Sequence, residues 1–315
     1  MTDQSLAFVF PGQGSQKVGM LAAAHEQFLA VRDTFAEASD TLGYDVWDLI
    51  QNGEQEALNL TETTQPVLLS ASVALWRAWC DAGGPAPAVM AGHSLGEFSA
   101  LVCAQALGFA DAVNLVRQRG SFMQSAVPVG EGAMAAIIGM EDDAINTICA
   151  EVAANTGGVV AAVNFNSPGQ VVIAGTTGAV DAAIEALKEG GAKRALPLPV
   201  SAPFHTELMK PAGERLKEAI ADIAISAPAV PVVHNVHAGR ESDPEQIRAL
   251  LVQQIYSPVQ WTQCIGAMTS AGVTQLVECG PGKVLSGLNR RIDKSLASFS
   301  LEEPEGFQQT LTDLA

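Results

Sequence analysis

The chain is organised around one stretch, Ala88-Val89-Met90-Ala91-Gly92-His93-Ser94-Leu95-Gly96-Glu97. A short apolar segment runs into a Gly-x-Ser-x-Gly turn, and the small and apolar residues at 98–104 predict a helix directly after it. Strand, sharp turn and helix together are the setting of a nucleophile elbow. The pattern alone also occurs in ordinary turns, so the flanking elements carry the prediction. We expect the Ser94 hydroxyl to project from the sheet edge, with the Leu95 amide facing a developing oxyanion.

An apolar run at 6–10 predicts a first strand that is buried on both faces of a parallel sheet. The glycine-rich loop that follows, at 11–16, does not fit a nucleotide site. Lys17 stands where the dinucleotide fingerprint needs a small residue, and the Gly-Lys-Ser/Thr pattern of a phosphate loop is absent. We therefore expect a tight loop whose amides approach a ligand at the carboxyl edge of the sheet.

The elements that complete an α/β core are expected on both sides of residues 129–197. Apolar spacing predicts helices at 21–38, 66–82, 111–125, 207–221, 244–254 and 262–270, and strands at 230–233 and 273–279. The elbow and this alternation together predict an α/β fold with a parallel sheet.

The middle of the chain has a different pattern. Strand-like segments are expected at 132–138, 159–164, 170–174 and 192–198, with helices at 141–154 and 177–189. The resulting βαββαβ order is that of a ferredoxin-like fold. We therefore predict an inserted ferredoxin-like small domain at 129–197, within a catalytic domain formed by 1–128 and 198–315.

Composition excludes several classes of function. Seventeen basic and 34 acidic residues give a net charge of −17, whereas nucleic-acid binding needs a basic surface. Charged residues interrupt the apolar stretches and no signal peptide is recognised, so we expect neither membrane insertion nor secretion. Five widely spaced cysteines are typical of reduced residues in a cytoplasmic protein.

A serine nucleophile needs a base within hydrogen-bond reach, and five histidines are available. His205 is the best candidate because Ser201, Ala202, Pro203 and Phe204 precede it in a short rigid loop before a helix. The alternative is a buried structural histidine. His234 and His237 lack a third ligand at a suitable spacing, so we expect no metal site.

The order of these residues departs from that of an ordinary α/β-hydrolase. In such enzymes the histidine comes late and after an acid, but here no histidine follows His237 and no acid stands out between Ser94 and His205. The departure suggests a Ser-His pair oriented by a neutral group.

Several further motifs carry a resemblance that extends over nearly the whole length. The sequence resembles the malonyl-CoA:acyl carrier protein transacylase family, whose fold is an α/β-hydrolase-like core with a ferredoxin-like insert. The motifs are Phe-Pro-Gly-Gln-Gly-Ser-Gln at 10–16, Gln-Pro at 65–66, Gly-His-Ser-Leu-Gly-Glu at 92–97, Arg-Gly-Ser-Phe-Met-Gln at 119–124, Asn-Phe-Asn-Ser-Pro-Gly-Gln at 164–170, Pro-Phe-His at 203–205, Gln-Ile-Tyr-Ser-Pro-Val-Gln-Trp at 254–261 and Glu-Cys-Gly-Pro-Gly-Lys-Val-Leu at 278–285.

The resemblance implies a role for each matching residue. Ser94 would take the malonyl group from coenzyme A as an ester, and His205 would act as base and then as acid. The backbone carbonyl of Gln254 would orient His205, which accounts for the missing acid. The amides of Gln13 and Leu95 would form the oxyanion hole.

The remaining pocket residues set selectivity in this interpretation. Arg119 would pair with the free carboxylate of malonyl, because a fixed guanidinium binds a carboxylate with two parallel hydrogen bonds. The alternative for Arg119 is a surface salt bridge near a helix end. Phe204 would crowd an α-methyl branch, so we predict malonyl over methylmalonyl. Gln65 and Asn164 would line the pocket.

The resemblance also implies the partners, which are a coenzyme A thioester and acyl carrier protein, with no cofactor and a monomeric enzyme. Because both partners are acidic, local basic residues must offset the net charge. The candidates are Lys193, Arg194, Lys283, Arg290, Arg291 and Lys294. A polyketide-pathway acyltransferase, a serine thioesterase and a non-enzymatic partner protein with the same fold remain as alternatives.

Overall fold

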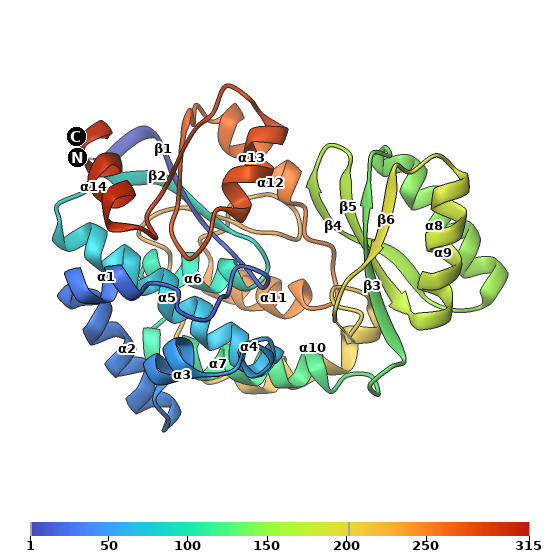
Figure 1. The fold of residues 1–315 in the computed structure, drawn as a ribbon, viewed down its shortest axis with the longest axis horizontal. Helices are drawn as coiled ribbons and strands as arrows, with labels where there is room; N and C mark the ends of the chain where they lie inside the picture. Colours follow the sequence, from blue (N-terminus) through green and yellow to red (C-terminus); the bar gives the residue numbers. More distant parts are fainter. Residues whose placement is uncertain (1, 201, 315) are drawn as a thin grey trace.

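The computed structural model describes residues 2–200 and 202–314, which form two sheets with separate cores (Figure 1). Ser201, predicted to lie in the loop before His205, lies outside the described residues. Within the described ranges, no helix combines the length and the apolar character needed to cross a bilayer.

The larger sheet is parallel throughout and has the order β7-β2-β1-β8-β9. Side chains of β1 alternate, with Leu6, Phe8 and Phe10 in one core and Ala7 and Val9 in another, so the sheet is buried on both faces. The predicted parallel sheet is confirmed. Its strands are β1 Thr2–Phe10, β2 Ala86–Gly92, β7 Val232–Val233, β8 Gln275–Glu278 and β9 Ala297–Ser300.

Helices cover both faces of this sheet. Residues of α2, α5, α6 and α7 share the core of Phe8, whereas residues of α12 and α13 share the core of Val9. The helices outside the middle segment are α1 Ala22–Gln27, α2 Leu29–Leu42, α3 Val46–Asn52, α4 Gln55–Leu58, α5 Thr61–Asp81, α6 Leu95–Cys103, α7 Phe109–Gln124, α10 Lys210–Ile220, α11 Pro244–Gln254, α12 Trp261–Ser270, α13 Val284–Ile292 and α14 Pro304–Asp313, together with the 3₁₀ turn Glu207–Met209.

Two helix predictions differ from the structure. The helix expected at 21–38 is broken at Phe28, whose backbone is extended (φ −109°, ψ 122°) and whose ring packs 4.6 Å from that of Phe307. A contact with a residue this distant in the chain has no local signal. The helix expected at 66–82 begins at Thr61, so Pro66 lies inside α5 rather than at its first turn.

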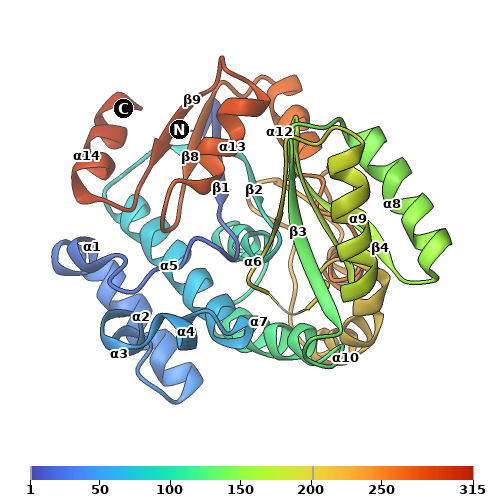
Figure 2. The same ribbon diagram turned by 45° about the vertical axis from the view of Figure 1, so that its right-hand side comes forward.

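The smaller sheet is antiparallel and has the order β4-β5-β3-β6. Helices α8 and α9 pack against one face and share with the sheet a core that includes Ile137, Ile145 and Leu187 (Figure 2). The chain order βαββαβ is as predicted. Its elements are β3 Gly132–Ile138, α8 Asp142–Thr156, β4 Val160–Ser167, β5 Gln170–Thr176, α9 Thr177–Glu189 and β6 Arg194–Pro197.

Backbone hydrogen bonds join the small sheet to the segment that leads into α12. Phe165 N donates to Val259 O at 3.0 Å, and Val259 N donates to Val163 O at 2.8 Å. The Thr262 hydroxyl also donates to Phe165 O, at 3.0 Å. These bonds hold β4 beside the carboxyl edge of the parallel sheet, where the elbow lies.

The elbow itself is tightly packed. Ser94 has φ 50° and ψ −108°, a strained conformation for a residue with a side chain. A Cβ atom at Gly92 would lie 1.8 Å from the Gly96 carbonyl carbon, and one at Gly96 would lie 2.0 Å from Phe10 O. Both glycines are therefore required for α6 to approach β1 and β2.

We predict that Gly96→Ala lowers the free energy of unfolding by about 2 kcal/mol or more, because the added methyl group meets rigid backbone. Urea denaturation measures the change. The matched control is Gly266→Ala, in the interior of α12, where a Cβ meets nothing within 4 Å. It should stabilise the protein by roughly 0.5–1 kcal/mol. Equal stability of the two variants would contradict the packing argument.

Candidate active site

Three residues from separate parts of the chain form a hydrogen-bonded line at the elbow. Ser94 Oγ lies 2.9 Å from His205 Nε2, and His205 Nδ1 lies 2.9 Å from the backbone carbonyl oxygen of Gln254. A carbonyl oxygen can only accept, so Nδ1 carries the proton and the Nε2 lone pair faces the serine hydroxyl. This arrangement has the geometry expected of a nucleophile and a base oriented by a neutral group.

The base is held in its uncharged form. His205 is 4% exposed, and burial, together with the positive charge of Arg119, lowers its pKa to about 3. An uncharged imidazole is ready to accept the serine proton at neutral pH.

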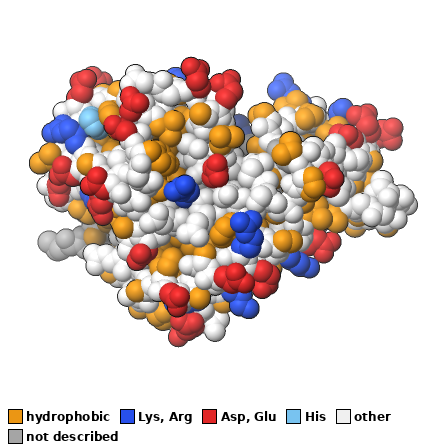
Figure 3. Space-filling view, turned by 90° about the horizontal axis from the view of Figure 1, so that it is seen from below, with side chains coloured by type: hydrophobic (Ala, Val, Ile, Leu, Met, Phe, Trp, Pro, Cys, Tyr) orange, Lys and Arg blue, Asp and Glu red, His pale blue; other side chains and the backbone are white. Residues whose placement is uncertain are grey.

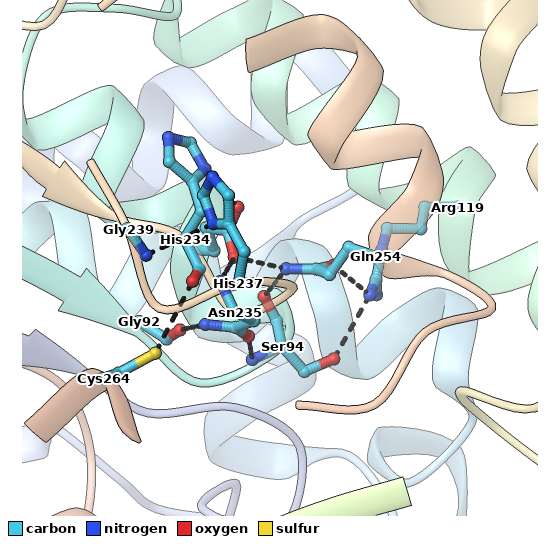
Figure 4. Close-up of polar contacts among 10 residues, drawn as sticks. Gly92, Ser94, Arg119, His234, Asn235, His237, Gly239, Gln254 and Cys264 are labelled. Atoms are coloured by element: carbon cyan, nitrogen blue, oxygen red, sulfur yellow. Dashed lines mark hydrogen bonds and ion pairs between the residues drawn. The ribbon is translucent and has the colours of Figure 1, made fainter. Parts of the chain in front are cut away.

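Arg119 reaches the same point from α7 and is only 1% exposed (Figure 4). Its guanidinium donates to Gln65 Oε1 at 2.8 Å, to Gln254 Oε1 at 2.8 Å and to Ser94 Oγ at 3.2 Å. Burial lowers its pKa to about 10, so the group stays charged at neutral pH. The alternative of a surface salt bridge is wrong, because the side chain is buried and its hydrogen bonds within the described chain go to uncharged oxygens.

Eight of the nine residues that the sequence singled out line one cavity of about 130 Å³. Gln254, the ninth, is fully buried and contacts Ser94, His205 and Arg119 through hydrogen bonds. The eight lining residues are Gln13, Gln65, Ser94, Leu95, Arg119, Asn164, Phe204 and His205.

Polar groups without a protein partner remain at this cavity. Within the described part of the chain, the Gln13 and Leu95 amides donate to no acceptor. Asn164 Oδ1 and Arg119 Nε are buried and likewise have no hydrogen-bond partner there. Buried polar groups are normally satisfied, so the free donors of Leu95 and Arg119 indicate a ligand with an oxygen to be stabilised and an anionic group, whereas Asn164 Oδ1 can only accept.

Sequence reasoning did not identify Asn235, which lies behind the serine. Asn235 Oδ1 accepts from Ser94 N at 2.7 Å, and Asn235 Nδ2 donates to Gly92 O at 2.7 Å, so one side chain braces the elbow. His93 Nε2 lies 2.8 Å from Asn166 Oδ1, on β4. A signal was present for Asn235, which closely follows β7 at the carboxyl end of a parallel strand, where site residues gather.

Chemically, the arrangement provides for attack by an activated hydroxyl on a carbonyl carbon. The serine and its base are in contact, two free amides lie at the same cavity, and a buried cation lies beside the hydroxyl. An acyl group that carries a carboxylate matches this set of groups.

Comparisons with known proteins show what this chain is similar to. The model of the acyl transferase domain family matches residues 7–296. The malonyl CoA-acyl carrier protein transacylase of Salmonella typhimurium is 58% identical over 306 residues, which cover 97% of this chain and 98% of that protein. The crystal structure of a malonyl-CoA:acyl carrier protein transacylase from Xanthomonas oryzae has a TM-score of 0.97 at 52% identity and full coverage of both chains.

A second similar structure includes a partner. It is a malonyl-transacylase in complex with a type II PKS acyl-carrier protein, with a TM-score of 0.96 and 52% identity over 98% of this chain and 99% of that chain.

The lowered pKa of His205 predicts how the reactivity of Ser94 depends on pH. We expect the rate of labelling by a fluorophosphonate to stay constant from about pH 8 to about pH 5, because the base remains uncharged throughout. A histidine of ordinary pKa would lose about tenfold by pH 5.5. Mass spectrometry follows the labelling, and circular dichroism checks that the protein stays folded.

Arg119→Gln serves as the companion variant in this experiment. It removes the charge that helps to lower the pKa of His205, so the acid decline should move to higher pH. A wild-type profile centred near pH 6.5 would contradict the lowered pKa of His205.

Proposed function

Since the chain belongs to the acyl transferase domain family, we propose that Ser94, His205 and Arg119 form the active site for a malonyl transfer. The reaction moves malonyl from malonyl-CoA to the phosphopantetheine thiol of an acyl carrier protein. The observation that carries the site assignment is the buried guanidinium of Arg119, which contacts the nucleophile and no carboxylate of the described chain.

In the first half-reaction, His205 Nε2 takes the proton of Ser94 Oγ as the oxygen attacks the thioester carbonyl carbon. The amides of Gln13 and Leu95 stabilise the tetrahedral oxyanion. The carbonyl of Gln254 accepts from Nδ1 and stabilises the imidazolium that forms. The carbon–sulfur bond then breaks, His205 returns its proton to the coenzyme A thiolate, and malonyl remains as an ester on Ser94.

The second half-reaction reverses these steps with a different thiol. The carrier thiol gives its proton to His205 and attacks the malonyl ester, and His205 then protonates the departing Ser94 oxygen. Water as acceptor would instead make the protein a thioesterase. The family relatives named as transacylases support the thiol acceptor.

Arg119 makes the pocket selective for an acyl group with a carboxylate. A malonyl carboxylate pairs with the guanidinium, whereas an acetyl group leaves that buried charge without a counterion. Pairing also cancels the positive charge that lowers the pKa of His205. The base is therefore stronger when malonyl is bound than when the pocket is empty.

We further propose that the chain forms two domains. We assign residues 1–128 and 198–315 to an α/β-hydrolase-like catalytic domain, supported by the strand, elbow and helix at Ser94. We assign residues 129–197 to a ferredoxin-like small domain, supported by the βαββαβ order and the strand order β4-β5-β3-β6. Met134 and Asn164 of the small sheet line the cavity together with Ser94.

Basic residues at the junction of the two sheets provide a docking site for acidic partners. The Arg291 guanidinium donates to Gln170 Oε1, at the start of β5, and Gly169 O accepts from Gly139 N. The Lys193 side chain, directly before β6, lies against Gly139, so Lys193 and Arg291 of α13 reach the same edge. Acidic side chains are spread over the face in Figure 3, with basic side chains singly or in small groups between them. Local positive charge is therefore needed to guide an acidic carrier.

The carrier itself has two candidate classes. Fatty-acid synthesis is supported by the names of the curated relatives and of similar structures. A polyketide carrier is a second candidate, because one similar transacylase was solved with a type II PKS acyl-carrier protein.

We further propose that the enzyme acts as a monomer, without a cofactor, in the cytoplasm. The free thiols of Cys80, Cys103, Cys149, Cys264 and Cys279 suit such a reducing compartment.

Intact-mass labelling with malonyl-CoA, acetyl-CoA and methylmalonyl-CoA tests the active site. We expect a malonyl ester on the wild type that clears only when holo carrier protein is added, and none on Ser94→Ala. Arg119→Ala should lower malonyl loading roughly 100-fold and acetyl loading much less, because a charge-assisted pair is lost. Phe204, which lines the cavity, should make methylmalonyl slower than malonyl.

Three outcomes of the labelling would contradict the proposal. An ester that clears in water would support the thioesterase. Absence of any Ser94-dependent loading would support a non-enzymatic protein. Equal rates with malonyl and methylmalonyl would remove the role assigned to Phe204.

Charge reversal tests the docking site. Replacing both Arg290 and Arg291 by Glu should raise the KM for carrier protein about tenfold or more and leave single-turnover loading from malonyl-CoA nearly unchanged. The control reverses Arg117 and Lys217, which are exposed residues of α7 and α10, helices at the opposite end of the molecule from α13 (Figures 1 and 2). An unchanged KM would remove Arg290 and Arg291 from the docking site.

A further inference from the structure

Glu97 is a fully buried acid whose role is not accounted for by the steps above. It lies in the first turn of α6, three residues after the nucleophile. Its Oε1 lies 2.7 Å from His234 Nδ1, and its Oε2 accepts from Asn235 N and from Gln254 Nε2, both at 2.9 Å. One carboxylate thus accepts hydrogen bonds from three residues of the two segments behind the active site.

We infer that Glu97 is a positioning residue: it orients the side-chain amide of Gln254, and through this amide it holds Arg119 in the geometry that selects a carboxylated acyl group. The inference rests on the proposed function, because selection by Arg119 is what the orientation would serve.

The Gln254 amide has two possible orientations, and its neighbours permit only one. Its Nε2 donates to Glu97 Oε2 at 2.9 Å and to Ser94 O at 3.0 Å, while its Oε1 accepts from Arg119 at 2.8 Å (Figure 4). A flipped amide would bring its oxygen against the carboxylate and its NH₂ group against the guanidinium. Both contacts are repulsive, so the acid on one side and the cation on the other select the same orientation.

The negative charge of Glu97 also favours the charged form of Arg119. This negative charge raises the pKa of Arg119 against the larger effect of burial, so it helps to keep the guanidinium charged. The carboxylate is separated from the guanidinium by the Gln254 amide and does not occupy its donors. A substrate carboxylate can therefore still pair with Arg119.

The same carboxylate supports the nucleophile. Glu97 Oε2 accepts from Asn235 N, and the Asn235 side chain accepts from Ser94 N at 2.7 Å. One acid near the elbow thus braces both the serine backbone and the group that selects the acyl chain.

The competing explanation is a structural role. An acid in the first turn of a helix interacts favourably with the helix dipole, and its loss would lower stability without changing which acyl group is preferred. The ratio of Ser94 loading rates with malonyl-CoA and acetyl-CoA separates the two explanations, because stability affects both rates alike.

Two conservative variants separate the reach of the side chain from its charge. Glu97→Gln keeps the length and removes the charge. Its amide oxygen can accept from Asn235 N and Gln254 Nε2, and His234 can accept at Nδ1 by moving its proton to Nε2. His234 Nε2 has no partner within the described chain, so this change of tautomer breaks no hydrogen bond. Glu97→Asp keeps the charge but retracts it by one methylene from Gln254.

The matched control is Glu278→Gln. Glu278 is also fully buried and accepts from Leu285 N at 3.0 Å and from Ser286 N at 2.7 Å, away from the cavity. Thermal unfolding of every variant reports the loss of stability. Loading of Ser94 is followed by intact mass.

We expect Glu97→Asp to lower the malonyl-to-acetyl ratio about tenfold or more, the effect of losing a hydrogen bond to a charged group. Glu97→Gln should stay within about threefold of the wild-type ratio, and Glu278→Gln should leave it unchanged. A folded Glu97→Asp variant with the wild-type ratio would overturn the inference. So would a Glu97→Gln variant that loses the ratio as strongly, since charge rather than orientation would then be responsible.

A further variant keeps the test decisive if Glu97→Asp does not fold. Gln254→Leu retains the backbone carbonyl that orients His205 and removes the amide through which Glu97 acts. It should lower the malonyl-to-acetyl ratio while acetyl loading persists, and an unchanged ratio would overturn the inference. If wild type is not loaded by malonyl-CoA at all, the proposed function fails instead.

Discussion

The close approach of Gly96 to the carbonyl oxygen of Phe10 is the constraint on which the active site depends. Because no side chain separates α6 from β1 at this point, the chain can reverse sharply at Ser94 and place it at φ 50°. Such strain persists only where neighbouring structure supports it, and Asn235 supplies that support through its bonds to Ser94 N and Gly92 O. The turn directs the hydroxyl toward His205 and leaves the Leu95 amide free at the start of the helix.

Electrostatics imposes the second constraint. Arg119 is almost fully buried, and a buried charge without hydrogen bonds would be costly. The oxygens of Gln65 and Gln254 meet this cost without adding a negative charge at the guanidinium. The acid whose charge acts on Arg119, Glu97, lies behind Gln254. An anionic acyl group therefore finds a charged partner whose donors no protein carboxylate occupies, and the neutral base beside it is strengthened when that group arrives.

The apolar spacing of the sequence predicted the helices and strands that depend on interactions between residues close together in the chain. The strand at Gly132–Ile138 and the helices at Thr177–Glu189 and Pro244–Gln254 have the predicted bounds, because their apolar spacing and their end residues agree. The break at Phe28 was missed because it depends on a contact with Phe307, near the other end of the chain. The helices α3 and α14 were also missed. Helix α3 has only seven residues and α14 has few apolar side chains, so packing on the rest of the protein stabilises both.

The sequence by itself determined the elbow at Ser94, the parallel strand before it and the βαββαβ order of the middle segment, because each is encoded by neighbours a few residues apart. Only the tertiary structure placed His205 beside the Ser94 hydroxyl and buried Arg119, and only it revealed Asn235 and Glu97. Ser94 meets His205 across 111 residues and Gln254 across 160. Whether a histidine is a base or a core residue, and whether an arginine is a surface ion pair or a buried cation, depends on which groups the fold brings to it over such separations.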